Sequence, residues 1–339
     1  MSMEKSIAEK SIFSWIEEKL APIYCTSEEF IYNEMESQSG YSLPIIYKPF
    51  DVTKKSHWDD RGRMYDFLYS IKGEGKKLLD FGPGDGWPSL IVAPYAKEVI
   101  GVDSSEKRIS VCKDNAKSLG ITNAEFIFYN SEDRLPFEDN TFDGIMAASS
   151  IEQTPNPKKT IGELYRILKP GRSIRIYYEA LSRYKDGFEN DIWIEKLNKE
   201  SCKLIIFDRN IKEEYVIQYG LTIAMSVEEL ISKLNNNTDF SQITISFLEE
   251  IKPKVTNALV LRTIHPSGKT YIKWFREAGF REVIPTYSGG IAASKLYDLY
   301  KEELPNSLEL VDEAIKKTVK IVIDLKAPIE MAPMIIAVK

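Results

Sequence analysis

Short apolar runs alternate with helix-spaced segments over residues 77–179, and this alternation limits the possible folds more than any other feature of the sequence. Each short run reads as a buried strand, and each intervening segment has the length and spacing of a helix. The expected strands are 77–81, 99–103, 124–129, 144–148 and 173–179. Because such alternation produces right-handed βαβ units, the sequence predicts a doubly wound, mostly parallel α/β sheet with helices on both faces.

The segments outside this alternation divide the rest of the chain. Residues 1–57 are expected to form an N-terminal helical cap, and residues 58–180 the core that carries the sheet. Residues 181–264 lack the βαβ period and are expected to form a largely helical insertion after the fifth strand. Residues 265–339 resume the alternation and complete a seven-stranded sheet, with a helical insert at about 290–320. Ligands of such sheets bind at the carboxyl ends of the strands, so we expect the cap and the insertion to cover that edge.

Composition disfavours several classes of site and partner. The formal net charge of -6 disfavours a nucleic-acid partner, because a phosphate backbone requires a basic face. The three cysteines are dispersed, no CxxC occurs and only two histidines are present, so we expect neither a metal site nor a disulfide framework.

No run approaches the ~20 apolar residues that span a bilayer. The first residues lack the apolar core of a signal peptide, and we expect a cytoplasmic protein without a membrane partner. The oligomeric state stays open.

A glycine-rich loop, DFGPGDG from Asp80 to Gly86, separates the first predicted strand from the helix that follows it. Glycines let the backbone turn sharply and approach a ligand without a Cβ in the way. The spacing is GxGxG, not the GxGxxG that binds a dinucleotide pyrophosphate. Asp80 would also repel a phosphate while suiting an ammonium group. The loop is therefore a candidate ligand site, with a tight turn that binds nothing as the alternative.

A second candidate site residue, Asp103, ends the next predicted strand in the run Gly101-Val102-Asp103-Ser104-Ser105. A carboxylate there can accept hydrogen bonds from both ribose hydroxyls of an adenosine. The alternative is that Asp103 or Ser104 caps the following helix. Folds that bind NAD and folds that bind S-adenosylmethionine both place the acid that contacts the ribose at this position, which favours a nucleoside ligand.

Four motifs, two of which contain the glycine loop and Asp103, carry a resemblance to a known family in their order along the chain. They are LLDFGPGDG, VIGVDSSEKRI, SEDRLPFEDNTFDGIMAASS and ELYRILKPGRSIRIYY. With these motifs, the run from Leu78 to Tyr178 resembles the class I S-adenosylmethionine (SAM)-dependent methyltransferase family, in its small-molecule branch. SGKTYIKWFREAGFREV resembles a later helix and strand of the same family. The resemblance implies a Rossmann-like fold, SAM as the cofactor and S-adenosylhomocysteine as the product.

The resemblance also implies a set of cofactor-binding residues on the glycine loop and at the ends of strands. They are Asp80, Phe81, Gly82, Pro83, Gly84, Gly86, Asp103, Ser104, Ser131, Glu132, Ser149 and Arg61. Asp80 would face the amino group of SAM, and Asp103 would bind the ribose. Ser131 and Glu132 replace the Asp and Ala with which this family usually contacts the adenine edge. Arg61 is a candidate partner for the SAM carboxylate, with a surface salt bridge as the alternative.

The reaction that the resemblance implies is in-line methyl transfer to a small-molecule acceptor. Positive charge disperses as the methyl group moves, so alignment in a dry site supplies most of the acceleration and no metal is required. A hydroxyl or protonated amine acceptor would also need a base. The candidate catalytic residues are Glu152, just after the fourth strand, and His265, before a helix. Their alternatives are an exposed loop acid and a capping or packing histidine.

Three other functions stay open on the sequence alone. A tRNA or rRNA methyltransferase is disfavoured by the acidic balance and by Ser149-Ser150-Ile151-Glu152, which stands where an (Asp/Asn)-Pro-Pro-aromatic motif would lie. An aminopropyltransferase is suggested by GPGDG alone. A non-catalytic SAM-binding protein is consistent with Ser131 and Glu132, and with Glu152-Gln153, which replaces a His-containing pattern that is common in the family.

Overall fold

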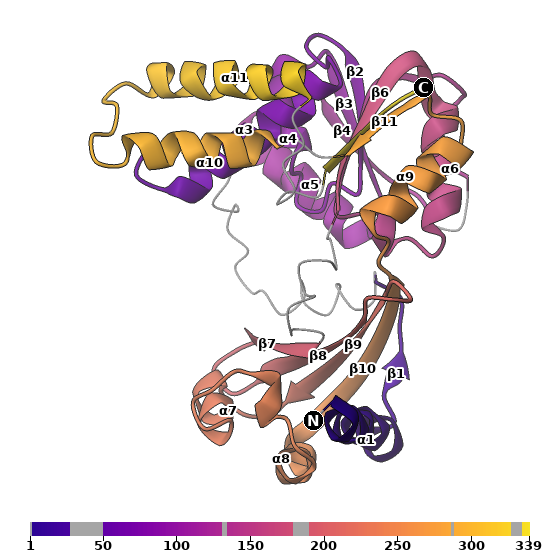
Figure 1. The fold of residues 1–339 in the computed structure, drawn as a ribbon, viewed down its shortest axis with the longest axis vertical. Helices are drawn as coiled ribbons and strands as arrows, with labels where there is room; N and C mark the ends of the chain where they lie inside the picture. The colour runs from indigo at the N-terminus through magenta and orange to yellow at the C-terminus, as the bar shows by residue number, and fades with distance from the viewer. Residues whose placement is uncertain (1, 28–49, 131–133, 179–189, 286–287, 327–333) are drawn as a thin grey trace. The chain divides into compact units, whose positions relative to one another are not determined.

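The computed structural model describes residues 2–27, 50–130, 134–178, 190–285, 288–326 and 334–339, with the backbone alone over 2–10 (Figure 1). These residues separate into two compact units, one within 1–41 and 181–265 and the other within 42–180 and 266–339. The amino-terminal segment thus belongs to the same unit as the insertion. In the part of the chain described here, no helix is both long and apolar enough to cross a membrane.

The larger unit is built on a seven-stranded sheet of order β11-β12-β6-β5-β2-β3-β4. The strands are β2 (Lys77–Phe81), β3 (Glu98–Asp103), β4 (Ala124–Phe128), β5 (Phe142–Ala148), β6 (Leu168–Tyr177), β11 (Glu282–Pro285) and β12 (Met334–Val338). Strands β2 to β6 pair in parallel, whereas β12 runs antiparallel to both β6 and β11. The prediction of a doubly wound, mostly parallel seven-stranded sheet is confirmed.

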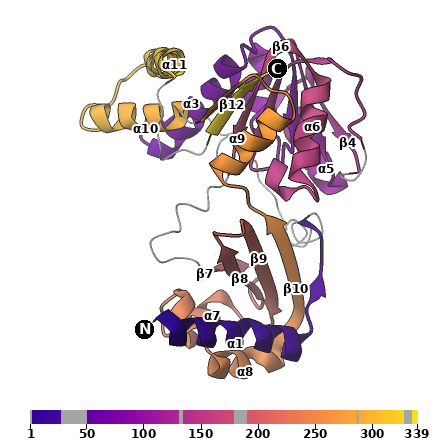
Figure 2. The same cartoon turned by 45° about the vertical axis from the view of Figure 1, so that its right-hand side comes forward.

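Helices cover both faces of this sheet, which explains why its strands are apolar on both sides. The helices are α3 (Lys55–Ser70), α4 (Ser89–Val92), α5 (Glu106–Leu119), α6 (Pro157–Ile167), α9 (Gly268–Glu277), α10 (Gly289–Tyr300) and α11 (Leu308–Leu325). In β2, Leu78 packs in a cluster with α3, α10 and α11, and Leu79 packs in the opposite cluster with α6 and α9. Figures 1 and 2 show these two groups of helices on either side of the sheet.

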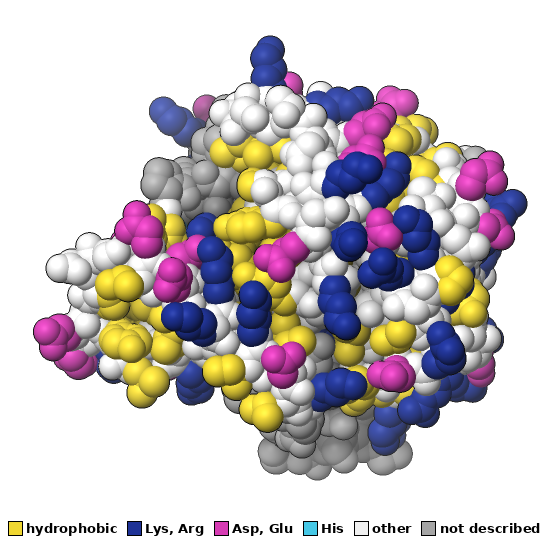
Figure 3. Space-filling model, turned by 90° about the horizontal axis from the view of Figure 1, so that it is seen from above, with side chains coloured by type: hydrophobic (Ala, Val, Ile, Leu, Met, Phe, Trp, Pro, Cys, Tyr) yellow, Lys and Arg dark blue, Asp and Glu magenta, His cyan; other side chains and the backbone are white. Residues whose placement is uncertain are grey.

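The helical insert between β11 and β12 is a hairpin of two helices, α10 and α11. Helix α10 lies so close to α3 that a Cβ added to Gly62 would stand 2.3 Å from the carbonyl oxygen of Gly289. Apolar side chains such as Leu299 and Leu310, which are 80% and 62% exposed, lie on the hairpin. Figure 3 shows apolar side chains exposed there, and acidic and basic side chains interspersed on the same face of the molecule.

A fully buried ion pair joins several of these elements. Arg175 of β6 donates from Nε and Nη2 to the two carboxylate oxygens of Asp66 in α3, at 2.8 and 2.9 Å. Both side chains are 0% exposed. Asp66 also accepts from the Ser70 hydroxyl at 2.9 Å and from the backbone N–H of Gly289, the first residue of α10, at 2.6 Å. The carboxylate therefore connects α3, the sheet and the helical hairpin.

The smaller unit contains a five-stranded sheet of order β1-β10-β9-β8-β7. Its strands are β1 (Ile23–Tyr24), β7 (Asn190–Lys196), β8 (Cys202–Asn210), β9 (Tyr215–Ile223) and β10 (Val255–Ile264). Strands β7 to β10 pair antiparallel. One face of this sheet packs in a cluster with α1 (Ser2–Leu20), α7 (Val227–Lys233) and α8 (Ile245–Ile251).

The expectation of a largely helical insertion over 181–264 is wrong, because apolar residues on both faces of the strands conceal the period of two. In β8, Leu204 and Ile206 belong to the cluster that contains the helices, while the intervening Ile205 is only 3% exposed in a separate cluster. Enrichment in β-branched and aromatic residues was the signal for strands in this region.

We predict that Asp66→Asn lowers the free energy of unfolding by about 3–5 kcal/mol, because it leaves the Arg175 charge buried without its carboxylate. Urea unfolding measures this loss. Lys55→Gln is the matched control, since it removes an exposed pair with Asp298 whose side chains are 47% and 37% exposed, and it should cost less than about 1 kcal/mol. A loss below 1 kcal/mol for Asp66→Asn would show that the buried pair does not hold these elements together.

Candidate functional site

The glycine loop lies at the carboxyl end of β2, the edge at which parallel sheets bind ligands. Gly82, Gly84 and Gly86 have φ values of +71°, +59° and +104°, which L side chains rarely adopt. A Cβ on Gly82 would stand 2.3 Å from the Cβ of Ser150, and one on Gly84 would stand 2.8 Å from Nη1 of Arg108. The backbone therefore requires glycine at these positions, as the sequence predicts.

Side chains from elsewhere in the fold hold this loop in place. Asn115 and Cys112 of α5 donate to the carbonyl oxygens of Asp85 at 2.7 Å and of Gly84 at 3.2 Å. The Ser150 hydroxyl, after β5, donates to the carbonyl oxygen of Phe81 at 2.5 Å. Sequence reasoning missed Asn115; its signal was a polar residue on the apolar face of the predicted helix.

Asp80 is the most distinctive acid of the site. Its side chain is 0% exposed, and Oδ2 accepts from the backbone N–H and the hydroxyl of Ser89 at 3.0 and 2.6 Å. Oδ1 has no hydrogen-bond partner among the described residues. Burial raises the pKa of Asp80 to about 7, against the lowering effect of the Ser89 bonds, and the charges of Asp103 and Asp85 add to the rise. A cation placed beside Oδ1 would satisfy this oxygen and favour the ionised carboxylate.

Asp103 ends β3, one strand across from the glycine loop. Its Oδ1 accepts from the backbone N–H of Ser105 at 3.0 Å. Neither Asp103 nor Ser104 caps the next helix, because Ser105 is the N-cap of α5 and its hydroxyl accepts from the N–H of Arg108. The capping alternative for Asp103 and Ser104 is thus wrong, and both side chains lie partly exposed at the carboxyl edge of the sheet.

The other predicted cofactor-binding residues near the loop differ in burial. Phe81 is 2% exposed and packs in the core, so a ligand can meet only its backbone. Pro83 is buried, with Cγ 3.0 Å from a Cβ built on Gly101. Ser149 follows β5, with a φ of +49° and an exposed side chain. The predicted adenine contacts at Ser131 and Glu132 lie outside the described residues.

Arg61 has a protein partner in the structure, in keeping with the salt-bridge alternative. Its Nε donates to Asp312 of α11 at 2.6 Å, in a pair that is 31% and 13% exposed. Arg63, which sequence reasoning missed, lies at the site. Its guanidinium carbon stands 5.0 Å from the ring centre of Tyr177 and 6.0 Å from that of Trp87, and it is ion-paired with Asp59.

The spacing between Arg63 and Phe67 in the sequence indicated which face of α3 carries Arg63. It lies four residues before Phe67, so both side chains share one face of α3. The Phe67 ring packs edge-on against Trp87, the residue that follows the glycine loop, with 5.7 Å between ring centres. Trp87 and Phe67 thus identify the face of α3 that is directed toward the loop.

Glu152 is buried rather than exposed, so the alternative of an exposed loop acid is wrong. It lies in the turn after β5 (Ile151–Gln153), with 2% exposure, and it accepts from the Tyr271 hydroxyl at 2.9 Å. Tyr178, after β6, packs on Tyr271 with 4.8 Å between ring centres. Burial, followed by the charge of Glu152, raises the pKa of Tyr178 to about 12 and the pKa of Tyr271 well above 10. Both phenols therefore stay protonated near neutral pH.

His265 belongs to the smaller unit, directly after β10. It is 5% exposed, and its backbone N–H donates to the carbonyl oxygen of Glu214 at 2.6 Å. Its proposed part in the chemistry of the larger unit stays a prediction. Among the residues that the structure describes, no group of three or more His, Cys, Asp or Glu side chains is arranged to hold a metal ion.

We predict that stability depends on pH through Asp80. Its pKa is 3.8 in the unfolded reference and about 7 in the fold, so between these values the folded protein keeps a proton that the unfolded chain has lost. Stability is therefore expected to fall as pH rises through this window and to level off above it. In Asp80→Asn this part of the pH dependence should disappear, as urea unfolding from pH 4 to pH 8 would measure. A profile identical to wild type would contradict the assignment, and Asp114→Asn, at an exposed position of α5, serves as the control.

Comparison with known proteins adds to this geometry. Residues 72–208 match the family described as a methyltransferase domain. The 24-methylenesterol C-methyltransferase 2 of Arabidopsis thaliana is 30% identical over 161 residues, which are 46% of this chain and 44% of the plant protein. The ubiquinone/menaquinone biosynthesis C-methyltransferase UbiE of Rickettsia prowazekii is 27% identical over 176 residues, which are 50% of this chain and 67% of that protein.

A solved structure of an S-adenosylmethionine-dependent methyltransferase from Clostridium acetobutylicum is 12% identical, with a TM-score of 0.49, and covers 91% of this chain and 95% of that chain. The chain spans about half the length, or less, of the sterol methyltransferases that it matches. The glycine loop with its buried acid and the parallel strands β2 to β6 thus lie in the part of the chain that matches a methyltransferase domain.

Proposed function

We propose that the chain transfers a methyl group from SAM to a small-molecule acceptor by in-line displacement. The observation that supports this most directly is Asp80. A fully buried carboxylate with one oxygen lacking a partner among the described residues, next to a loop that only glycines can form, suits the ammonium group of an amino-acid tail. An ion left in this position without a partner would be costly, so the site favours a cationic ligand.

The residues present fit the remaining parts of SAM. The positive-φ glycines leave the loop without side chains where the methionyl part would lie. Asp103, one strand across, would accept the ribose hydroxyls, Ser104 would lie against the adenine, and Ser131 and Glu132 would contact its edge. Arg63, between Trp87 and Tyr177, replaces Arg61 in our proposal as the partner of the carboxylate.

SAM supplies an electrophilic methyl group on a sulfonium centre. The chain's own contribution is to hold the acceptor in line and to exclude water. Ser149 follows β5 at the carboxyl edge of the sheet, and Glu152 lies buried in the next turn with its carboxylate bonded to the Tyr271 hydroxyl. We propose that Glu152 orients or deprotonates the acceptor. Tyr271 holds the Glu152 carboxylate in place, and Tyr178 packs on Tyr271. His265 is the second candidate base.

Two observations support a small molecule as the acceptor. The relatives reported above are named for sterols and for ubiquinone and menaquinone, and none of these is a macromolecule. The upper face in Figure 3 carries acidic and basic side chains together, and the net charge of the chain is -6. We also propose a cytoplasmic location, because Cys25, Cys112 and Cys202 are dispersed along the chain and form no disulfide framework, as expected in a reducing compartment.

Calorimetry with SAM, S-adenosylhomocysteine and decarboxylated SAM tests the proposal. We expect the first two to bind and the third to bind more weakly, because it lacks the carboxylate that Arg63 would meet. Radiolabelled SAM, incubated with the protein and a small-molecule extract, should then yield a labelled product and S-adenosylhomocysteine. Preference for decarboxylated SAM would indicate an aminopropyltransferase. Salt-dependent binding of tRNA would indicate a nucleic-acid methyltransferase. Tight binding of SAM without any methylated product would indicate a non-catalytic SAM-binding protein.

We predict that Asp103→Ala weakens the binding of S-adenosylhomocysteine by about 1–3 kcal/mol, the cost of removing hydrogen bonds to a charged acceptor. Isothermal titration measures the change, and circular dichroism checks that the variant is folded. Asp114→Ala, on the exposed side of α5, is the control and should bind like wild type. Unchanged affinity in a folded Asp103→Ala protein would refute the ribose assignment.

We predict opposite outcomes for two arginines that lie two residues apart in α3. Arg63→Ala should weaken S-adenosylhomocysteine binding by about 1.5–3 kcal/mol, because it removes a charge-assisted contact with the carboxylate. Arg61→Ala should leave that affinity nearly unchanged and lower the melting temperature instead, because its partner is Asp312. Titration and thermal unfolding of both variants test this, and the reverse result would restore Arg61 as the ligand residue.

A further inference from the structure

The helical hairpin of α10 and α11 concentrates exposed apolar side chains. Half of the large apolar side chains that are exposed among the described residues lie on it, although single exposed leucines are ordinary on a protein surface. A concentration of this kind on one element is typical of an interaction surface. Figure 1 shows α10 and α3 on one side of α11, which leaves the other side of α11 as the candidate surface. The exposed apolar residues of the hairpin are Leu299, Tyr300, Leu308, Leu310, Ile321 and Leu325.

Helical spacing divides α11 into an inner and an outer face. The outer face carries Leu310 and Ile321, which are 62% and 58% exposed and lie about three turns apart. Glu313 and Lys317 lie between them on the same side of the helix. These four residues are the outer face of α11. The inner face consists of apolar residues that recur every four positions and are buried in the cluster with α3, namely Val311, Ile315 and Val319.

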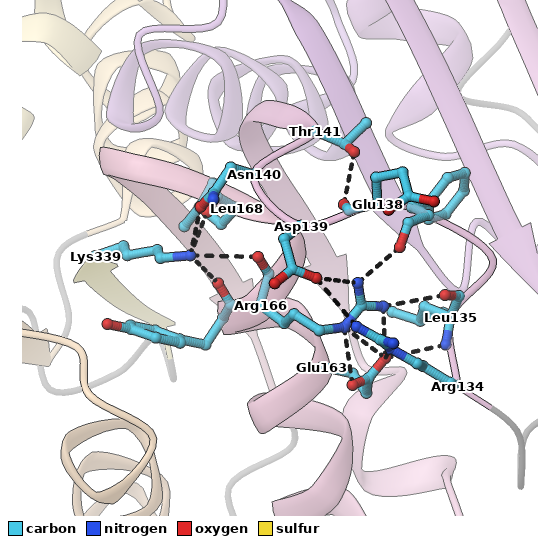
Figure 4. A network of polar contacts seen from close by, with 12 residues as sticks. Arg134, Leu135, Glu138, Asp139, Asn140, Thr141, Glu163, Arg166, Leu168 and Lys339 are labelled. Carbon is cyan, nitrogen blue, oxygen red and sulfur yellow. Dashed lines mark hydrogen bonds and ion pairs between the residues drawn. The ribbon is translucent and has the colours of Figure 1, made fainter.

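The charges of the outer face differ from those that hold the fold together. Arg166 of α6 is 14% exposed, and it donates to Glu163, to Asp139 and to two backbone carbonyl oxygens (Figure 4). Glu313 and Lys317 are 63% and 76% exposed and are 3.5 Å apart, and neither has another ion pair among the described residues. Such an exposed pair contributes little to stability, so the fold does not require this arrangement of charges.

The outer face is complementary to a second copy of itself. Leu310 and Ile321 are centred on the same point of α11 as Glu313 and Lys317, at the level of Ile315. A two-fold axis through this point would set two copies of the helix antiparallel, with Leu310 against Ile321 of the second copy. Glu313 would then face Lys317 of the second copy, and the symmetry repeats both contacts. Antiparallel helix dipoles also attract one another.

A lipid surface suits the hairpin less well than a second copy does. Helices that lie on membranes carry Lys and Arg on their polar face. In contrast, the loop before α11 and the first turn of α11 are acidic, because Glu302 is 90% exposed and both Glu303 and Glu309 are exposed. Anionic lipids would repel these carboxylates. The charges of the hairpin therefore favour a protein partner.

We propose that the outer face of α11 is the interface of a symmetric homodimer, in which two copies of this helix pair antiparallel. Leu310 packs against Ile321 of the second copy, and Glu313 pairs with Lys317 of the second copy. The inference does not depend on methyl transfer, because these four residues are not among those to which we assign cofactor binding or catalysis.

Analytical ultracentrifugation of the full chain over a range of concentrations tests the proposal. Wild type is expected to form a dimer that dissociates on dilution. Glu313→Lys and Lys317→Glu each place like charges opposite one another twice, so each should raise the dissociation constant of the dimer about tenfold or more. An equimolar mixture of the two variants should recover the dimer, because the added lysine of one then faces the added glutamate of the other.

The mixture distinguishes an interface from an effect on the helix itself. Each variant keeps like charges four residues apart within its own α11, which weakens that helix equally in the mixture and alone. Recovery of the dimer can therefore arise only from contacts between chains. Asp114→Lys is the matched control, since it makes the same change of charge at an exposed position of α5 and should leave the dimer unchanged.

Three results would overturn the proposal. One is a wild type that stays monomeric at every concentration, and another is a dimer that neither charge reversal weakens. The third is a monomer that sediments with phosphatidylcholine vesicles and no longer does so after Leu310→Gln, because the surface would then bind lipid. Circular dichroism checks that each variant is folded. If a charge reversal unfolds α11, Leu310→Gln, which adds no charge, should still weaken the dimer.

Discussion

The buried pair of Asp66 and Arg175 is the contact on which the site most depends, because it fixes α3 against the sheet. A charged side chain that is buried away from solvent needs a partner of opposite charge, and Arg175 donates two parallel hydrogen bonds to Asp66. The same carboxylate accepts from the first N–H of α10. Helix α3 in turn carries Arg63 and Phe67, which lie against the glycine loop through Trp87. The geometry of the proposed cofactor site thus depends on a pair to which we assign no contact with the cofactor.

The sheet and the glycine loop could be predicted because their causes are local. A left-handed backbone needs glycine, and Gly82, Gly84 and Gly86 all adopt it. The end of a buried strand brings Asp103 to the ligand edge whatever the rest of the chain does. The predicted order of strands and helices over 77–179 follows from the same kind of short-range pattern, and the observed topology agrees with it.

Features that depend on partners distant in the sequence could not be predicted. The carboxylate that Arg61 contacts, Asp312, lies in a helix 251 residues away. The burial of Glu152 depends on Tyr271, 119 residues later, and no property of the loop sequence reveals it. In the smaller unit, β8 buries side chains in two clusters, which removes the alternation by which a strand is recognised. The β-strand propensity of the residues was the signal that favoured strands there, but an apparent helical spacing of apolar residues outweighed it.

The position of β12 has a consequence for synthesis of the protein on the ribosome. This strand lies between β6 and β11 in the sheet, although more than 150 residues separate it from β6 in the chain, as their paired residues Met334 and Tyr177 show. Until β12 has left the exit tunnel, one side of β6 has no neighbouring strand and offers its amide and carbonyl groups to any other extended chain. The nascent protein is therefore expected to depend on chaperones during this interval, while the smaller unit is made.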